Sequence, residues 1–222
     1  LSLIVLEGIL SADNAIVLAV LAHPLPKAQQ KKALRYGMIG AFTFRALAVL
    51  LAVQLIETPW LKVVGGLYLL YLPATYFLKR EKRSGAPVEG RRPPRRMFGL
   101  SQFWSTVVAI ELTDIVFSID SILAAVGLSQ KVWVVIAGGV LGIVAMRFVA
   151  GGFLRLIEIR PALIEGAYII VGWIGIKLIL EFLHQEQIID FLIPKEVTYG
   201  LIVVVFLASL FVRRRASPTV KS

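Results

Sequence analysis

Long apolar runs, separated by short charged or Pro-containing segments, dominate this chain of 222 residues. Each run is close to the roughly 20 residues that an α-helix needs to cross the hydrocarbon core of a bilayer. The pattern predicts seven transmembrane helices, near residues 1–22, 33–56, 60–79, 101–127, 131–154, 162–183 and 197–212. We therefore expect an all-α, polytopic membrane helix bundle.

Positive charge falls mainly on one side of these helices. If the N-terminus is outside, most Lys and Arg residues lie in the cytoplasmic connections and the C-terminal tail, whereas Lys62, Lys131 and Lys195 lie outside. The positive-inside rule therefore predicts an N-out, C-in orientation. The same bias, together with the attraction of basic residues to anionic lipid headgroups, explains the net charge of +10. The charge therefore needs no nucleic-acid partner, and we expect none.

A long basic connection divides the chain into two similar halves. It is rich in Pro and Gly, which predicts a cytoplasmic linker. The predicted domains are a first three-helix repeat (1–79), the linker (80–100), a second repeat (101–183), and a seventh helix with a basic tail (184–222). Each repeat crosses the membrane three times, which is an odd number, so the second repeat enters the membrane from the opposite side. The two halves then form an inverted repeat, as in many secondary transporters.

The two halves share polar residues as well as helix number. In the second helix of each repeat, Gly40 and Arg45 of the first half match Gly142 and Arg147 of the second half. An acidic motif also occurs in the first helix of each repeat. Ionisable groups in hydrocarbon cost at least about 2.5 kcal/mol, so their duplication indicates a functional site. The candidate metal ligands are Glu7, Asp13, Asn14, Glu111, Asp114, Asp120 and Ser121, supported by Ser11, Ser118, Arg45 and Arg147.

Helical geometry leaves two interpretations open for the motif. On a regular helix, Asp13 and Asp120 point away from the face that carries the other polar residues. Either the first and fourth helices are broken, near Ser11 and Ser118, or each Asp faces a neighbouring helix. Broken helices at the membrane midplane are typical of inverted-repeat transporters.

The candidate ligands all donate oxygen. Mn²⁺, Ca²⁺ and Mg²⁺ suit such a set, whereas Zn²⁺ and Cu⁺ usually draw His, Cys or Met. Without metal the carboxylates need protons or the cationic side chains of Arg45 and Arg147, so exchange of metal for protons is physically natural. The chain contains no Cys, which excludes disulfides and thiolate ligands.

Two stretches, residues 6–15 and 110–122, resemble the acidic signatures of the TerC family of integral membrane proteins. The resemblance extends over about residues 1–212, and it relates the chain to Alx-type manganese exporters and to the LysE-related superfamily. It implies seven helices, a bacterial inner (plasma) membrane, manganese export and an association with tellurium resistance. It also places the family's acidic positions on the candidate metal ligands named above.

The expected function is therefore export of divalent cations, Mn²⁺ first and Ca²⁺ as the alternative, with protons as the counter-transported ion and no organic cofactor. A different function also fits the sequence, that of a non-transporting membrane sensor or scaffold that binds metal or soluble partners. An intramembrane aspartyl protease would need two Asp residues sharing a proton, and neither a Tyr-Asp nor a Gly-x-Gly-Asp signature surrounds the candidates. We therefore expect no enzymatic activity.

Overall fold

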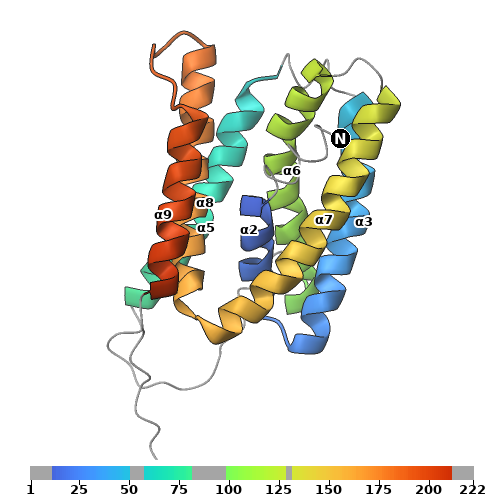
Figure 1. Cartoon of the computed structure of the whole chain (residues 1–222), viewed down its shortest axis with the longest axis vertical. Coiled ribbons are helices and arrows are strands. Elements are labelled where there is room, and N and C mark those ends of the chain that lie inside the picture. The colour runs from blue at the N-terminus through green and yellow to red at the C-terminus, as the bar shows by residue number, and fades with distance from the viewer. Residues whose placement is uncertain (1–11, 51–57, 82–98, 129–131, 212–222) are drawn as a thin grey trace, which may run out of the picture.

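The computed structural model describes residues 12–50, 58–81, 99–128 and 132–211, which form a helix bundle without strands (Figure 1). The helices are α2 (Ala12–Ala22), α3 (Lys27–Leu50), α5 (Trp60–Glu81), α6 (Gln102–Leu128), α7 (Val132–Ile159), α8 (Ala162–Gln185) and α9 (Lys195–Phe211). The all-α prediction is confirmed, and each predicted span overlaps one of these helices.

Helix α3 begins earlier than the apolar run that predicted it. Its first residues, from Lys27 onward, are polar helix formers that extend the helix beyond the hydrocarbon region. The side chain of Gln30 fixes this start, because its amide donates hydrogen bonds to the carbonyl oxygens of His23 at 3.1 Å and Leu25 at 2.9 Å. An apolar run therefore marks only the membrane-embedded part of such a helix.

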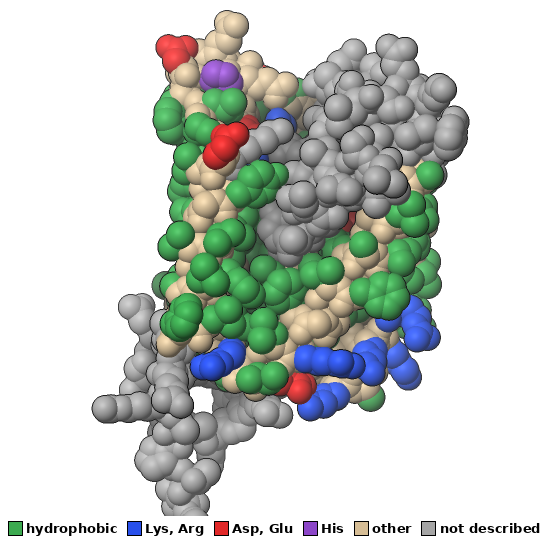
Figure 2. All heavy atoms as spheres, viewed as in Figure 1, with side chains coloured by type: hydrophobic (Ala, Val, Ile, Leu, Met, Phe, Trp, Pro, Cys, Tyr) green, Lys and Arg blue, Asp and Glu red, His purple; other side chains and the backbone are tan. Residues whose placement is uncertain are grey.

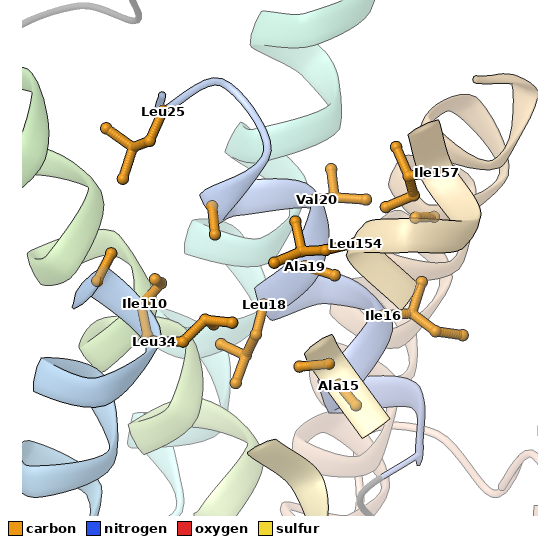
Figure 3. Packing of buried hydrophobic residues seen from close by; sticks show 14 of the residues in the cluster. Ala15, Ile16, Leu18, Ala19, Val20, Leu25, Leu34, Ile110, Leu154 and Ile157 are labelled. Atoms are coloured by element: carbon orange, nitrogen blue, oxygen red, sulfur yellow. The ribbon is translucent and has the colours of Figure 1, made fainter. Parts of the chain in front are cut away.

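Helix α2 lies at the centre of the bundle, between α5, α8 and α9 on one side and α3, α6 and α7 on the other (Figure 1). All residues from Ala15 to Val20 are buried, as expected for a helix that is apolar all round. Figure 3 shows this packing, in which Leu18 of α2 faces Leu34 of α3 and Ile110 of α6, while Ile16 lies near α7. The core of the protein therefore forms around α2.

The helix contacts are symmetric between the two predicted repeats. The first helix of each repeat packs against the second helix of the other, so that α2 contacts α7 and α6 contacts α3. The two second helices, α3 and α7, contact each other, as do the two third helices, α5 and α8. Exchanging the halves therefore converts these contacts into one another. Helix α9 packs against α8 and has no counterpart in the first half.

The contact between α5 and α8 is the most extensive in the described part of the bundle. The backbones meet at Gly66 and Gly175, where a methyl group on either residue would lie within 2.8 Å of the other's carbonyl oxygen. Near one end, Glu181 accepts from Lys177 at 2.9 Å and forms an ion pair with Lys62 at 3.6 Å. Small residues and ion pairing thus hold the third helices together.

The outer surface has the character of a membrane protein. Within the described residues, three helical stretches are long and apolar enough to cross a bilayer, Trp60–Leu78, Ala137–Ile159 and Ala162–Gln185, and Glu196–Phe211 is a shorter apolar helix. Large apolar side chains such as Phe148 and Phe211 are 77% and 84% exposed. Side chains of this kind are favourable on a surface that faces lipid.

Charge is concentrated at the two ends of the bundle. Figure 2 shows Lys and Arg side chains along the lower edge, below a largely hydrophobic flank, and acidic side chains with a histidine near the upper end. Exposed basic residues at the start of α3 and the end of α7 contribute to the lower edge, where Lys27 pairs with Glu158 at 3.0 Å. The positive-inside rule assigns this basic end to the cytoplasm.

The close contact of α5 and α8 generates a stability prediction. We expect Gly175→Ala to lower the thermal unfolding temperature of the purified protein in detergent, because the added methyl group would meet the Gly66 carbonyl oxygen at 2.8 Å. Overpacking of this kind costs about 1–3 kcal/mol. Gly152→Ala is the matched control, because its methyl group would find nothing within 4 Å. Equal unfolding temperatures for both variants would contradict the prediction.

Candidate functional site

The polar residues of the second repeat lie near the middle of α6. Asp114 and Ser118 are buried, and Glu111 is half-buried. The helix continues without a break through this region, so the interpretation in which it is broken near Ser118 is wrong. Ser118 instead donates a hydrogen bond within the helix, from Oγ to the Ile115 carbonyl oxygen at 3.0 Å.

The structure describes only part of the predicted ligand set. Besides Glu111 and Asp114, it describes the side chain of Asn14, which is buried in α2. Asp13 belongs to α2, and Asp120 and Ser121 belong to α6, but these three side chains lie outside the described part, as do Glu7 and Ser11 altogether. Among the described residues, no three His, Cys, Asp or Glu side chains are grouped so that they could hold a metal ion. The complete ligand set therefore stays a prediction.

Asp114 lines a small cavity at the point where α2, α3, α6 and α7 meet. The volume of the cavity is about 20 Å³, enough for one water molecule or one bare ion. Arg147 also lines the cavity, and the remaining lining is apolar; Leu18, Leu34 and Ile110 belong to it and converge in Figure 3. The first and second helices of both repeats thus enclose a buried carboxylate.

Glu111 faces α3 rather than this cavity. A methyl group on Gly40 would overlap the carboxylate of Glu111, and one on Gly37 would lie 2.6 Å from the Ile110 side chain. The two helices approach this closely because both positions lack a side chain. Gly40 therefore provides the space that the Glu111 carboxylate occupies, a role that its match with Gly142 did not indicate.

Arg45 and Arg147 each reach the backbone of the opposite helix. Nη1 of Arg45 donates to the Gly139 carbonyl oxygen at 3.2 Å, and Nη2 of Arg147 donates to the Lys31 carbonyl oxygen at 3.5 Å. The stem of Arg45 also covers Gly139, where a methyl group would lie 2.6 Å from Cδ. These arginines, expected as counter-ions, therefore also join α3 to α7.

Charges interact at the centre of the bundle. Glu111 and Asp114 lie three residues apart on one helix and repel each other when both are ionised. Arg45 attracts the Asp114 carboxylate and so offsets part of the cost of removing it from water. A cationic group from α3 thus partly compensates the charge of Asp114 on α6.

Tyr68, which is not among the predicted site residues, joins α5 to α6 beside the acidic residues. Its hydroxyl donates to the Ala109 carbonyl oxygen at 3.1 Å and lies 3.4 Å from Oγ1 of Thr113. Thr113 is fully buried and donates to the same carbonyl at 2.7 Å. A pattern shared by the third helices, Gly66-Leu67-Tyr68 and Gly166-Ala167-Tyr168, is the signal that could have identified it.

The close contact between Gly40 and the Glu111 carboxylate leads to a second prediction. Gly40→Ala should displace the Glu111 carboxylate without unfolding the protein, because the flexible end of this side chain can rotate away. If the site binds Mn²⁺, the ion should raise the unfolding temperature of the unsubstituted chain. Gly40→Ala and Glu111→Gln should each reduce this rise, and the double variant should reduce it no further.

Gly151→Ala is the control for this experiment, because its added methyl group would contact nothing within 4 Å. Independent, additive losses in the double variant would contradict the assigned contact.

Comparison with known proteins identifies the family. Residues 1–218 match the family described as "Integral membrane protein TerC family". The membrane protein YceF of Bacillus subtilis is 44% identical over 214 residues, which are 95% of this chain and 79% of YceF. YkoY of the same organism is 41% identical over 207 residues, 85% of this chain and 61% of YkoY.

A more distant relative, the UPF0053 inner membrane protein YgdQ of Escherichia coli, is 30% identical over 195 residues, 81% of this chain and 79% of YgdQ. No solved structure matches the chain. The family description and the names of these relatives confirm the predicted localisation in a bacterial inner membrane. Because the family match covers nearly the whole sequence, the chain belongs to the TerC family of integral membrane proteins.

Proposed function

We propose that the protein is a transporter that exports divalent metal cations, Mn²⁺ in the first place, in exchange for protons. The observation that carries this proposal is the position of Asp114, buried beside a cavity of about 20 Å³ between the two repeats. Carboxylates are costly inside a membrane bundle and are typical of ion and proton pathways. The cavity volume matches a single ion.

The helix pairing supports transport by alternating access. Each first helix packs against the second helix of the other repeat, so a site between α2, α3, α6 and α7 is shared by both repeats. Rocking of one repeat against the other would expose such a site to one side of the membrane at a time.

Charge balance supports coupling to protons. When a cation leaves the site, the buried Asp114 and the half-buried Glu111 lose its compensating charge. Protonation neutralises such carboxylates at a lower cost than that of burying them ionised. Metal and protons would therefore occupy the acidic group in turn.

The chemistry of the predicted ligands supports Mn²⁺, with Ca²⁺ as the alternative, because carboxylate, amide and hydroxyl oxygens suit hard or borderline cations. Tellurite is an oxyanion that the acidic residues would repel. Any association with tellurium resistance would therefore act indirectly.

Transport can be tested with inside-out proteoliposomes that contain the full chain. We expect an acidic lumen to stimulate Mn²⁺ uptake, because protons leaving the lumen would drive metal entry. Asp114→Asn should reduce this uptake by about tenfold or more, because it removes a carboxylate from the cavity. Asp13→Asn and Asp120→Asn should do the same if these residues complete the ligand set.

Glu158→Gln is the matched control, because it neutralises a carboxylate whose ion pair with Lys27 lies at the surface and contributes little. Mn²⁺ uptake that is insensitive to the gradient would remove the proton-coupling part of the proposal. No uptake of Mn²⁺ or Ca²⁺ by the unsubstituted protein would refute transport.

Deletion of the linker separates a transporter from a scaffold. Removal of residues 81–94 should leave gradient-driven Mn²⁺ uptake within about twofold of the full chain, because the residues that line the cavity all belong to α2, α3, α6 and α7. A scaffold that uses the basic linker would lose partner binding, and a complete loss of uptake in a correctly inserted variant would contradict the prediction.

A further inference from the structure

Basic side chains of α3 and α7 lie together at the cytoplasmic end of the bundle, where Figure 2 shows them along the lower edge. Lys31 and Arg35 of α3 are exposed, as is Arg155 of α7. Among the described residues, the ion pair that joins these two helices is the one between Lys27 and Glu158. The charge of the other basic side chains is therefore not balanced within the described part of the protein.

Arg147 of α7 adds to this charge. Its side chain extends toward the same end, where Nη2 donates to the carbonyl oxygen of Lys31 at 3.5 Å. Its guanidinium group is close enough to that of Arg35 for the two charges to repel each other. Nη1 of Arg147 is buried and has no hydrogen-bond partner among the described residues. Each helix thus brings one guanidinium group to this place, and a buried donor is left over.

The repeated halves do not require this pair of arginines. The offset that relates Arg45 to Arg147 pairs Arg35 with Ala137 in the second half. The matched arginine, Arg45, therefore meets no guanidinium group from the corresponding position, and it attracts the Asp114 carboxylate instead. The meeting of two arginines is specific to the cytoplasmic end and needs an explanation other than symmetry.

The surface of α7 beside Arg147 is open. Gly151 and then Arg155 follow Arg147 at intervals of about one helical turn, so the three residues share one face of the helix. A methyl group on Gly151 would find nothing within 4 Å, and the same holds for the exposed Gly152. The missing side chains leave space beside the guanidinium groups in which a group from outside the protein can lie.

Aromatic side chains mark this level as a membrane interface. Tyr36 follows Arg35 in α3, and the centroid of its ring lies 5.5 Å from that of Trp104, in the first turn of α6. Both rings are exposed. Because Tyr and Trp favour the headgroup level of a bilayer, this pair places Arg35 near the depth of the lipid phosphates.

We propose that the phosphate group of an anionic phospholipid from the cytoplasmic leaflet binds between Arg35 and Arg147 and bridges α3 to α7. Guanidinium groups bind phosphate through paired, charge-assisted hydrogen bonds. Basic pockets between transmembrane helices on the cytoplasmic side are typical sites for anionic headgroups. The bound phosphate relieves the repulsion between the two arginines and supplies an acceptor for Nη1 of Arg147.

The position of this lipid site gives it a structural role. Helices α3 and α7 belong to different predicted repeats, so the bound lipid joins the two repeats at the cytoplasmic end. A zwitterionic lipid serves less well, because its ammonium group offsets the attraction of its phosphate to two arginines. The site does not depend on which ion the protein transports.

Lipid binding can be measured on the purified full-length protein in detergent. Phosphatidylglycerol, phosphatidylcholine and inorganic phosphate are titrated separately, and native mass spectrometry and the thermal unfolding temperature report binding. The test variant is Arg35→Gln, which removes one exposed guanidinium group. Arg160→Gln is the matched control, because it removes an equal exposed charge that lies just after the last residue of α7.

We expect phosphatidylglycerol to bind and to raise the unfolding temperature, and the other two ligands to have little effect at equal concentration. Arg35→Gln should weaken phosphatidylglycerol binding by about tenfold or more, and Arg160→Gln by less than about twofold. Without lipid, Arg35→Gln should leave the unfolding temperature unchanged or raise it, because the repulsion with Arg147 is removed. An arginine with only a structural role would lower the unfolding temperature with or without lipid when substituted.

Three results would overturn the proposal. Equal binding of phosphatidylglycerol and phosphatidylcholine would show that negative charge is not recognised. Equal losses in Arg35→Gln and Arg160→Gln would show a diffuse attraction of anionic lipid to the basic end. Inorganic phosphate that binds as tightly as phosphatidylglycerol would identify a soluble anion as the ligand.

Arg147→Gln provides a second test of the bridge. It should weaken phosphatidylglycerol binding as Arg35→Gln does, and the double variant should lose little more than either single variant, because both arginines hold one phosphate. Independent, additive losses would contradict a shared phosphate. If Arg147→Gln does not fold, the comparison of Arg35→Gln with Arg160→Gln alone decides the proposal.

Discussion

Carboxylates are costly to keep out of water inside a membrane bundle, and the packing at the centre of this protein depends on offsetting that cost. Asp114 sits where four helices meet, and Arg45 on α3 offsets part of its charge. The same arginine donates to the Gly139 backbone of α7, so the group that compensates the charge also helps to fix the packing. Electrostatics and architecture are therefore coupled at this point.

Glycine positions make that coupling geometrically possible. Gly40 leaves room for the Glu111 carboxylate, and Gly139 leaves room for the stem of Arg45. A transmembrane interface gains little from apolar burial relative to lipid, so close approach and polar contacts contribute much of its stability. The small residues here lie where a charged side chain passes between two helices.

The helices could be predicted because their spans are visible in local sequence, and the inverted repeat is predicted from local patterns of the same kind. Apolar run length identifies the spans, and the recurrence of acidic and Gly/Arg patterns relates the halves. The true start of α3 at Lys27 could not be predicted from hydropathy, because its first turns are polar. The continuity of α6 through Ser118 also had no local signal, since a regular helix and a broken one share the same residues there.

The composition of the cavity depends on tertiary packing and was predicted only in part. Asp114 and Arg147 were identified by their placement within apolar runs, whereas the apolar residues that complete the lining come together only when α2, α3 and α7 meet α6. Asp13 and Asp120 were predicted with equal reason, but their side chains lie outside the described part of the chain. Their relation to the cavity remains a prediction from the repeated motif.

The pairing of α5 with α8 has a consequence for motion. These helices exchange places when the two predicted repeats are interchanged, so their contact maps onto itself. A change in which each repeat adopts the conformation of the other therefore begins and ends with the same α5–α8 geometry. The direct backbone contact at Gly66 and Gly175 can act as a stationary pivot. The packing free energy of α5 against α8 is then equal in the outward-open and inward-open states.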